Sequence, residues 1–330
     1  MTKKNVLLIC GGGSSEHDVS LISAGFIYDQ LKDWEDINLY WVEICKDGSR
    51  KDKEGNLCEL RKSGELVYPD KSIELHFAIP CIHGYPGETG DIQSVFEMMG
   101  LPYLGCGPEA NILCFNKVST KLWLDNLGIP NTPSCYVSSL EADQKEKALE
   151  FFEKNPDVYI KAASQGSSIG CYHCTDSKDL FNLLEEAFKY SSYVLIEKTI
   201  KGRELETSAY EFDGEIIVTA PGEIICPNEF YTYEEKYDGK SETTTTPKAI
   251  NVPEEVVTLM KKYASTAFKA LKIKHLSRVD FFLADDGQVY LNEINTFPGM
   301  TPISLFPLMM EHNGHSFKTW LKAIVSKESR

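Results

Sequence analysis

Short apolar runs alternate with amphipathic helical stretches along most of the chain. Continuous apolar residues predict buried strands at 5–10, 75–82 and 158–163. The first two lead through glycine-rich turns into stretches with helical periodicity. A long helix is predicted at 253–272 and a closing helix at 314–326. Strands that alternate with helices in this way indicate an α/β fold.

The most informative stretch lies near the C-terminal end, where two apolar, β-rich runs flank an Asp-Gly dipeptide at 286–287. This dipeptide suits a two-residue hairpin turn, which fixes how the residues of the two strands pair. The pairing brings Asp280 opposite Glu293 and Arg278 opposite Asn295. Because side chains two residues apart share a face, all four lie at one end of one face.

Two directly opposed carboxylates destabilise a hairpin unless something positive lies between them. Oxygen ligands without His or Cys suit Mg²⁺ held together with substrate phosphates. The alternative is an exposed hairpin with solvated charges. Against it, the two faces are otherwise apolar, with Val279, Phe281, Leu283 and Ile294 on one and Phe282, Ala284, Val289 and Leu291 on the other. A hairpin buried on both sides should not carry unpaired acids, so the pattern favours a metal site.

Composition and charge narrow the class of protein. At 330 residues the chain is long enough for two or three domains. The net charge of −15 argues against a nucleic-acid partner, and no apolar run approaches the ~20 residues of a membrane span. The ten cysteines lie mostly in apolar runs, which indicates free thiols in a reducing cytosol. Cys171 and Cys174 form a lone CxxC pair, interpreted as structural.

Polar residues follow the first two predicted strands. The glycine turn after 5–10 opens a helix, whose free N–H groups and dipole suit an anion. Glu16 stands where a dinucleotide fingerprint needs its third glycine, and spacing alone leaves it equally a helix-terminus residue or a ligand contact. His83 and Glu88 follow the strand at 75–82, at the edge where open α/β sheets bind ligands, although a His there is often structural.

A G-x-G-x-x-A pattern at 105–110 imitates a dinucleotide-binding turn. The preceding strand is too short, and Asp125, at the spacing of a ribose-binding acid, falls in a helical stretch rather than at the end of a strand. A nicotinamide enzyme is therefore a distant alternative. Lys117 and Lys121 lie four apart on the same predicted helix, and by themselves they are interpreted as a solvated pair.

Two later stretches carry candidate nucleotide-binding chemistry. Lys161 ends an apolar strand, and the loop after it, with Gly166, Ser167 and Ser168, is rich in the donors that a phosphate needs. It is not a Walker A loop, because no Gly-Lys-Ser/Thr occurs in the chain. The polar, aromatic-studded stretch 228–250 shows neither strand nor helix periodicity. A loop of this length is either disordered or a functional lid, and its aromatic residues favour a lid.

Together these motifs resemble the D-alanine–D-alanine ligase family of the ATP-grasp superfamily. The resemblance covers nearly the whole chain, through GGGSSEHDVS, HGYPGETGDIQ, NKVSTK, KAASQGSSIG, IEKTIKGREL, FYTYEEKY, RVDFF and NEINTFPGMTPIS. It implies a Rossmann-like N-terminal domain at 1–105 and two α+β domains that sandwich ATP, at 106–197 and 198–330. The last would contain the lid 228–250 and the metal hairpin.

The resemblance also implies a nucleotide and metal site. ATP would be bound by Lys117, Lys161, Ser168, Glu197, Lys198, Ile200, Glu204 and Lys236. Two Mg²⁺ or Mn²⁺ ions would be bound by Asp280, Glu293 and Asn295, with Glu293 bridging. A monovalent cation such as K⁺ is an optional further cofactor. Gln165 and Thr89 depart from the common family pattern, so neither is given a ligand role.

The implied reaction is ligation of two D-alanines through a D-alanyl phosphate, for peptidoglycan synthesis. The substrate and catalytic residues would be Glu16, Val19, His83, Ser167, Tyr237, Arg278, Gly299, Ser304 and Leu305. Glu16 would anchor the first ammonium and Ser304 the second carboxylate, while Arg278 and the Gly299 N–H stabilise developing charge. The family also implies a cytoplasmic homodimer. The alternatives are an ATP-grasp ligase for other acids and a non-catalytic nucleotide-binding protein.

Overall fold

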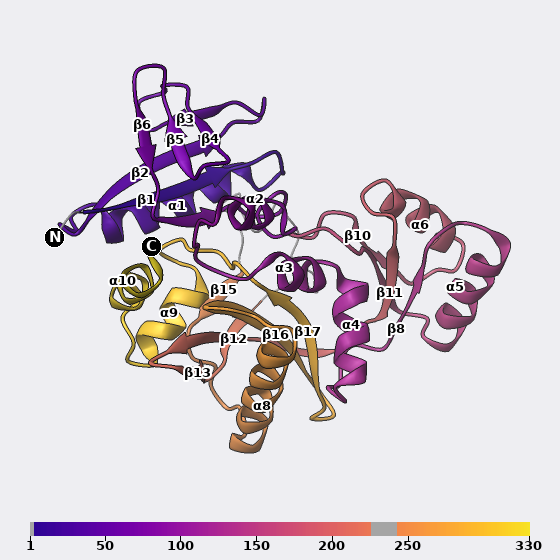
Figure 1. Ribbon diagram of the computed structural model, residues 1–330. Helices are drawn as coiled ribbons and strands as arrows, with labels where there is room; N and C mark the ends of the chain where they lie inside the picture. The colour runs from indigo at the N-terminus through magenta and orange to yellow at the C-terminus, as the bar shows by residue number, and fades with distance from the viewer. Residues whose placement is uncertain (1–2, 226–242) are drawn as a thin grey trace.

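The computed structural model describes residues 3–225 and 243–330, whose arrangement is drawn in Figure 1. The N-terminal part is built on a sheet of order β3-β2-β1-β7, formed by β1 (Lys4–Gly11), β2 (Ile37–Ile44), β3 (Arg50–Asp52) and β7 (Phe77–Cys81). Strand β1 is parallel to both β2 and β7. The glycine turns after β1 and β7 therefore leave the sheet at the same edge, which brings two separate polar loops together.

Each of these turns leads into a helix, as the sequence predicts. Helix α1 (His17–Leu31) follows β1, and α2 (Asp91–Met99) follows β7. The polar stretch between them holds a small sheet of three short strands, β4 (Glu59–Arg61), β5 (Glu65–Val67) and β6 (Ser72–Glu74).

The central part is an antiparallel sheet of order β10-β9-β11-β8. Its strands are β8 (Ser134–Val137), β9 (Val158–Ala162), β10 (Cys171–Cys174) and β11 (Val194–Lys198). The apolar sides of α5 (Ala142–Lys154) and α6 (Leu180–Phe188) cover one face of the sheet. The CxxC pair lies in β10, and no disulfide joins any of the cysteines in the described ranges, which is consistent with a structural role.

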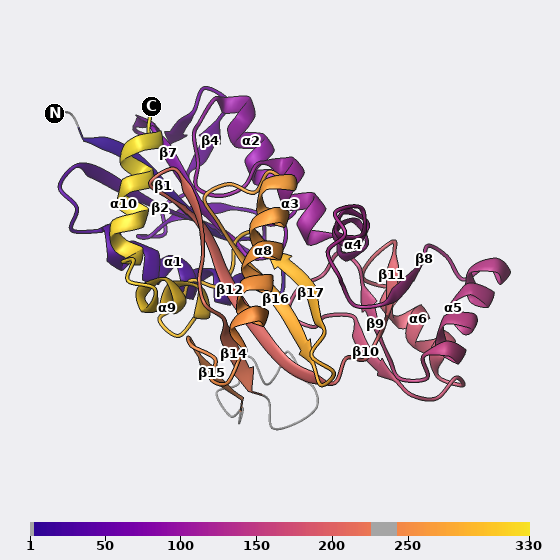
Figure 2. The same cartoon turned by 90° about the horizontal axis from the view of Figure 1, so that it is seen from below.

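The third sheet has the order β15-β14-β12-β16-β17, with β13 also paired to β12. Its strands are β12 (Gly202–Phe212), β13 (Glu215–Val218), β14 (Gly222–Ile225), β15 (Thr244–Thr246), β16 (Leu276–Ala284) and β17 (Val289–Asn295). Helix α8 (Glu254–Ala270) packs on one face of this sheet. Figure 2 shows α3 (Pro108–Phe115) and α4 (Lys117–Asn126) between the N-terminal part and the central sheet.

Asp125 lies within α4, which confirms that the G-x-G-x-x-A stretch is not a dinucleotide-binding turn. The domain limits 1–105, 106–197 and 198–330 stay a prediction. Cys114 and Leu124, from the two helices assigned to the central domain, belong to the same hydrophobic cluster as β16, β17 and α8. None of the described helices is long and apolar enough to cross a membrane.

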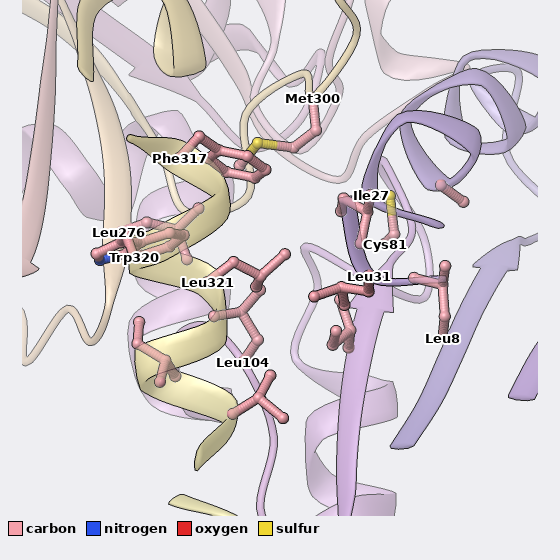
Figure 3. Packing of buried hydrophobic residues seen from close by; sticks show 14 of the residues in the cluster. Leu8, Ile27, Leu31, Cys81, Leu104, Leu276, Met300, Phe317, Trp320 and Leu321 are labelled. Atoms are coloured by element: carbon pink, nitrogen blue, oxygen red, sulfur yellow. The ribbon is translucent and has the colours of Figure 1, made fainter. Parts of the chain in front are cut away.

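One hydrophobic core joins the first and last parts of the chain. Figure 3 shows Ile27 of α1 and Cys81 of the N-terminal sheet on one side of this core, with Met300 and, from α10 (Phe317–Glu328), Phe317 and Leu321 on the other. Two residues of α9 (Leu305–His312), Phe306 and Met310, belong to the same core. The chain ends also meet, because the ammonium of Lys4 donates to the carbonyl of Arg330 at 2.6 Å. The N-terminal and C-terminal segments therefore share one core.

Replacing Leu321 with alanine is expected to lower the free energy of unfolding by about 2–5 kcal/mol. Leu321 is fully buried in the shared core, so its loss leaves a cavity between the two segments. Urea denaturation measures the effect. Lys318→Ala, on the exposed face of the same helix, is the control and should change stability by less than about 0.5 kcal/mol. Equal effects of the two changes would contradict the shared core.

Candidate active site

The hairpin of β16 and β17 pairs its polar end as the sequence predicts. Arg278 lies opposite Asn295, and Asp280 lies opposite Glu293. The predicted two-residue turn is wrong, however. Ala284 pairs with Gln288 through a backbone hydrogen bond of 2.9 Å, so the loop has three residues, with Gly287 at a positive φ of 85°.

The extra loop residue is compensated by an irregularity in the ladder. The register shifts between Asp280 and Phe281, so Phe281 pairs with Leu291 rather than with its predicted partner. Val289 and Leu291 therefore join Val279 and Phe281 in the core beneath α8, not the face on which they were predicted. The predicted pairing of the acids is confirmed because the two deviations cancel at that end.

Arg278 neutralises the acids of the hairpin. Its Nε and Nη2 each donate to a carboxylate oxygen of Asp280 at 2.7 Å, and Nε lies 3.2 Å from Oε2 of Glu206. Asn295 donates from Nδ2 to Asp280 at 3.0 Å. Burial alone would lower the pKa of Arg278, but Asp280 and Glu206 raise it, so the guanidinium stays charged.

The donor set at this end of the hairpin fits Mg²⁺. Asp280, Glu293 and the amide oxygen of Asn295 offer oxygen ligands only, and Asp280 and Asn295 are already in contact. The side chain of Glu293 is about a third exposed and borders the adjoining cavity, so it can reach an ion bound with a ligand there. Three oxygen donors with room for phosphate oxygens and water are typical of a magnesium site.

A cavity of about 450 Å³ lies between the central sheet and the third sheet, a size suited to a small-molecule ligand. Seven of the eight residues predicted to bind the nucleotide line it: Lys117, Lys161, Ser168, Glu197, Lys198, Ile200 and Glu204. The eighth, Lys236, lies outside the described residues, as do Tyr237 and most of the predicted lid. The cavity also reaches Glu293, so the metal hairpin and the lysines face the same space.

Glu197, a buried carboxylate in the lining of the cavity, pairs with two lysines, of which Lys161 also lines the cavity. Oε1 of Glu197 lies 2.7 Å from the ammonium of Lys121, and its Oε2 contacts that of Lys161. The ammonium of Lys121 also donates to Oδ1 of Asn131 at 3.2 Å and to the carbonyl of Thr132 at 3.0 Å. Burial would raise the pKa of Glu197, but the two lysines outweigh it and lower this pKa to about 2.

The interpretation of Lys117 and Lys121 as a solvated pair is therefore wrong. Only 5% of Lys121 is exposed, and its ammonium is held by Glu197. Lys117 instead donates to the carbonyl of Gln165 at 2.7 Å and lies 3.5 Å from Glu293. The i, i+4 spacing from Lys117 is the one sequence signal that could have marked Lys121 as part of the site.

The serine loop after β9 touches the N-terminal part. Ser167 and Ser168 adopt positive φ values of 49° and 62°, and Oγ of Ser167 donates to Oε1 of Glu16. A Cβ on Gly166 would lie 3.1 Å from Oε2 of the same carboxylate, so any larger residue there would require the Glu16 carboxylate to shift. Glu16 precedes α1, but its side chain forms no capping hydrogen bond. Of the two alternatives for Glu16, its observed side-chain contact favours a role in the site.

The loop between β17 and α9 carries the predicted acyl-transfer residues. Ser304 precedes α9 and its Oγ accepts from the N–H of Thr301 at 2.9 Å, while Leu305 is the first residue of that helix. A Cβ on Gly299 would lie 3.0 Å from the Ser304 hydroxyl, so these two predicted residues are adjacent. The start of a helix offers free N–H groups and a favourable dipole for a carboxylate.

The other predicted substrate residues of the N-terminal part, Val19 and His83, follow strands β1 and β7. Val19 is half-buried in the first turn of α1, and His83 is buried in the loop after β7. Glu88, left without a role from the sequence, accepts a hydrogen bond from the N–H of Gly84 at 2.7 Å. Burial, reinforced by the neighbouring Glu16, raises the pKa of Glu88 to about 8. Two acids thus lie together at this edge of the N-terminal sheet.

The cavity between two sheets, lined by lysines and bordered by the acidic end of the hairpin, places the protein in the class of ATP-grasp ligases. A family model described as the D-ala D-ala ligase N-terminus matches residues 5–106, and one described as the D-ala D-ala ligase C-terminus matches residues 123–326. The chain belongs to the D-alanine–D-alanine ligase family.

Known proteins resemble the chain over almost its full length. It is 48% identical to a D-alanine–D-alanine ligase of Shewanella amazonensis, over 99% of both chains, and 49% identical to one of Vibrio campbellii, over 96% of this chain and 97% of the relative. The crystal structure of D-alanyl-alanine synthetase A from Vibrio cholerae superposes with a TM-score of 0.95 at 47% identity, covering 99% of each chain. The VanG D-Ala:D-Ser ligase of Enterococcus faecalis has a TM-score of 0.86 at 26% identity, covering 98% and 99%.

Proposed function

We propose that this protein joins two D-alanine molecules into D-alanyl-D-alanine, with conversion of ATP to ADP and phosphate, for peptidoglycan precursor synthesis. One observation carries the proposal: the contact of Ser167 with Glu16. It joins the serine loop of the nucleotide cavity to a carboxylate suited to an amino-acid ammonium. The family to which the chain belongs and the names of its relatives support the same substrate.

The first half of the reaction activates a carboxylate, which is a poor acyl donor. The carboxylate of the first D-alanine receives the terminal phosphoryl group of ATP, giving D-alanyl phosphate and ADP. Lys117 and Lys161 spread the charge of the phosphates, and the serine loop orients them. Asp280, Glu293 and Asn295 would hold two Mg²⁺ or Mn²⁺ ions, which neutralise charge on the transferring group when bound.

The second half joins the two amino acids. The neutral amine of the second D-alanine attacks the acyl carbon, the bond to the phosphate oxygen breaks, and the amine loses a proton. Arg278 and the N–H of Gly299 stabilise the oxyanion that forms on the acyl oxygen. Ser304 and the N–H of Leu305 hold the second carboxylate at the start of α9, while Glu16 holds the first ammonium.

The proposal extends to the setting of the reaction. We infer a cytoplasmic enzyme that works as a homodimer through its N-terminal domain, with K⁺ as an optional further cation. Tyr237, which lies outside the described residues, would by the family resemblance favour an amine over a hydroxy acid as the second substrate. The VanG relative is named as a D-Ala:D-Ser ligase. A ligase with a different second amino acid is therefore the second candidate, and the same assay separates the two.

The deciding experiment measures phosphate release from ATP and Mg²⁺ with D-alanine as the only amino acid, and identifies the product by mass. We expect release to depend on D-alanine, not L-alanine, and to yield the dipeptide in equal amount. Turnover only with a different second acid, such as D-serine or D-lactate, would retain the ligase mechanism and reject the product. If no acid tested gave phosphate release, the ligase function would be rejected, and nucleotide binding would be the only remaining function.

A further inference from the structure

The loop that carries Gly299 contacts the N-terminal part through the residues on both sides of Gly299. The backbone N–H of Met300 donates to Oγ of Ser23 on α1 at 3.2 Å. The ring of His83 lies beside that of Phe297, with centroids 6.2 Å apart, and the Phe297 backbone acts as an acceptor that raises the pKa of His83. Oγ of Ser23 and Nε2 of His83 lie 2.9 Å apart, so the two contacts belong to one hydrogen-bond network.

Oγ of Ser23 accepts from the N–H of Met300 and lies within hydrogen-bond distance of Nε2 of His83. The Phe297 backbone raises the pKa of His83 as an acceptor for a ring N–H. Because Nε2 faces Ser23, we infer that Nδ1 carries the proton and that Nε2 accepts from the Ser23 hydroxyl. Ser23 is fully buried and His83 is 4% exposed. Burial lowers the pKa of His83, in agreement with a neutral ring.

The network acts most directly on the loop of Gly299, while Glu16 and Arg278 influence the pKa of His83 through their charges. Gly299 is two residues after Phe297 and directly before Met300, so both contacts act on its position. The groups around the phosphate site have other partners: Lys117 contacts Gln165 and Glu293, and Lys161 contacts Glu197. A loss at Ser23 would therefore disturb acyl transfer more than phosphoryl transfer.

We propose that Ser23 is a positioning residue for the second half of the ligation, acting through Met300 and His83 on the N–H of Gly299. The inference rests on the proposed function, in which that N–H stabilises the oxyanion. The donor must point at the place where the negative charge develops, and small displacements weaken such stabilisation steeply. The N-terminal part thus sets the geometry of a catalytic loop that lies at the far end of the sequence.

Without Ser23 the two halves of the reaction become uncoupled. D-Alanyl phosphate still forms, because the groups that serve phosphoryl transfer are unchanged. Attack by the second amine slows, and water competes by adding to the acyl carbon. The bond to the phosphate oxygen then breaks, and D-alanine and inorganic phosphate leave. Phosphate is released without a matching amount of dipeptide.

The test compares Ser23→Ala with Ser20→Ala. Ser20 lies one turn earlier on α1, is equally buried and also makes two hydrogen bonds, but to Gly11 and Cys81 of the N-terminal sheet. We expect the ratio of phosphate to dipeptide to rise at least about threefold in Ser23→Ala, with an unchanged KM for ATP, and to stay at one in Ser20→Ala. A ratio of one in both variants, or an equal rise in both, would overturn the proposal.

A second measurement does not depend on the substrate. In ¹⁵N NMR spectra of the imidazole groups, His83 should show a neutral ring protonated on Nδ1, altered in Ser23→Ala and unaltered in Ser20→Ala. If the wild-type protein forms no dipeptide from D-alanine, the proposed function is rejected. The spectrum still tests the hydrogen bond between Ser23 and His83. A His83 signal that is unchanged by Ser23→Ala would reject it.

Discussion

Replacing Glu293 with glutamine is expected to lower the rate of dipeptide formation by on the order of 10³-fold or more. Glutamine keeps the size of the side chain but removes the charge that would bind the two Mg²⁺ ions. The fold should persist, because the Glu293 side chain is about a third exposed and lies 3.5 Å from Lys117, a separation that permits only a weak ion pair. Steady-state turnover at several Mg²⁺ concentrations, with circular dichroism as a check of folding, measures the effect.

Asp285→Asn provides the matched control for Glu293→Gln. Asp285 is exposed in the loop of the same hairpin, at the end far from the paired acids. The same change of carboxylate to amide should leave turnover within about twofold there, since the residue touches neither the cavity nor the metal ligands. A Glu293→Gln enzyme that works at the wild-type rate would remove Glu293 from the metal site.

Replacing Glu197 with glutamine is expected to destabilise the protein by about 3–5 kcal/mol and to impair nucleotide binding. The carboxylate is buried between the ammonium groups of Lys121 and Lys161, which would then repel each other without a counter-charge. Glu197 now outweighs burial and raises the pKa of Lys161. Without Glu197, burial lowers that pKa, so affinity for ATP should fall as the pH rises.

The acid stability of the protein gives an independent measure of the same group. The folded-state pKa of Glu197 is about 2, against an ordinary value of 4.5. Because the folded pKa is depressed, its contribution is fully present above pH 4.5 and is lost as the pH falls towards 2. The difference amounts to about 3 kcal/mol.

Urea denaturation between pH 6 and pH 2 measures that contribution. We expect the free energy of unfolding to fall more steeply with decreasing pH in the wild type than in Glu197→Gln. Glu186→Gln is the control, because Glu186 forms an exposed ion pair with Lys189 that should contribute less than about 1 kcal/mol. Parallel curves for the wild type and Glu197→Gln would mean that the buried carboxylate does not carry this charge.

Much of the site could be predicted because its residues lie in short, ordered motifs. The strand that ends in Lys161 and the serine loop after it are continuous in the sequence, and the cavity contains them together. The hairpin shows the limit of such reasoning. Its acids pair as predicted, although the loop is one residue longer and the ladder contains a compensating irregularity. The sequence does not reveal the longer loop or the register shift, because the two changes cancel and leave the acids at the end of the hairpin paired as predicted.

Buried polar residues were harder to place. The sequence predicts a solvated Lys121, because a lysine on a helix is usually exposed. Its real environment depends on Glu197, which lies 76 positions later and approaches only when β11 joins the central sheet. The same holds for Ser23, an ordinary helix residue in the sequence, whose partner Met300 is 277 positions away.

The order of residues alone determines the α/β class and the pairing of the acids in the hairpin, and it predicts their role as metal ligands and that of the serine loop in phosphate binding, because each depends on neighbours along the chain or on a single turn. The tertiary structure determines which distant polar groups come into contact. It brings Glu16 to Ser167, buries Lys121 against Glu197, and places the loop of Gly299 in hydrogen-bond contact with α1. Periodicity reports whether a side chain is buried, but it carries no information about which distant group lies across the interface.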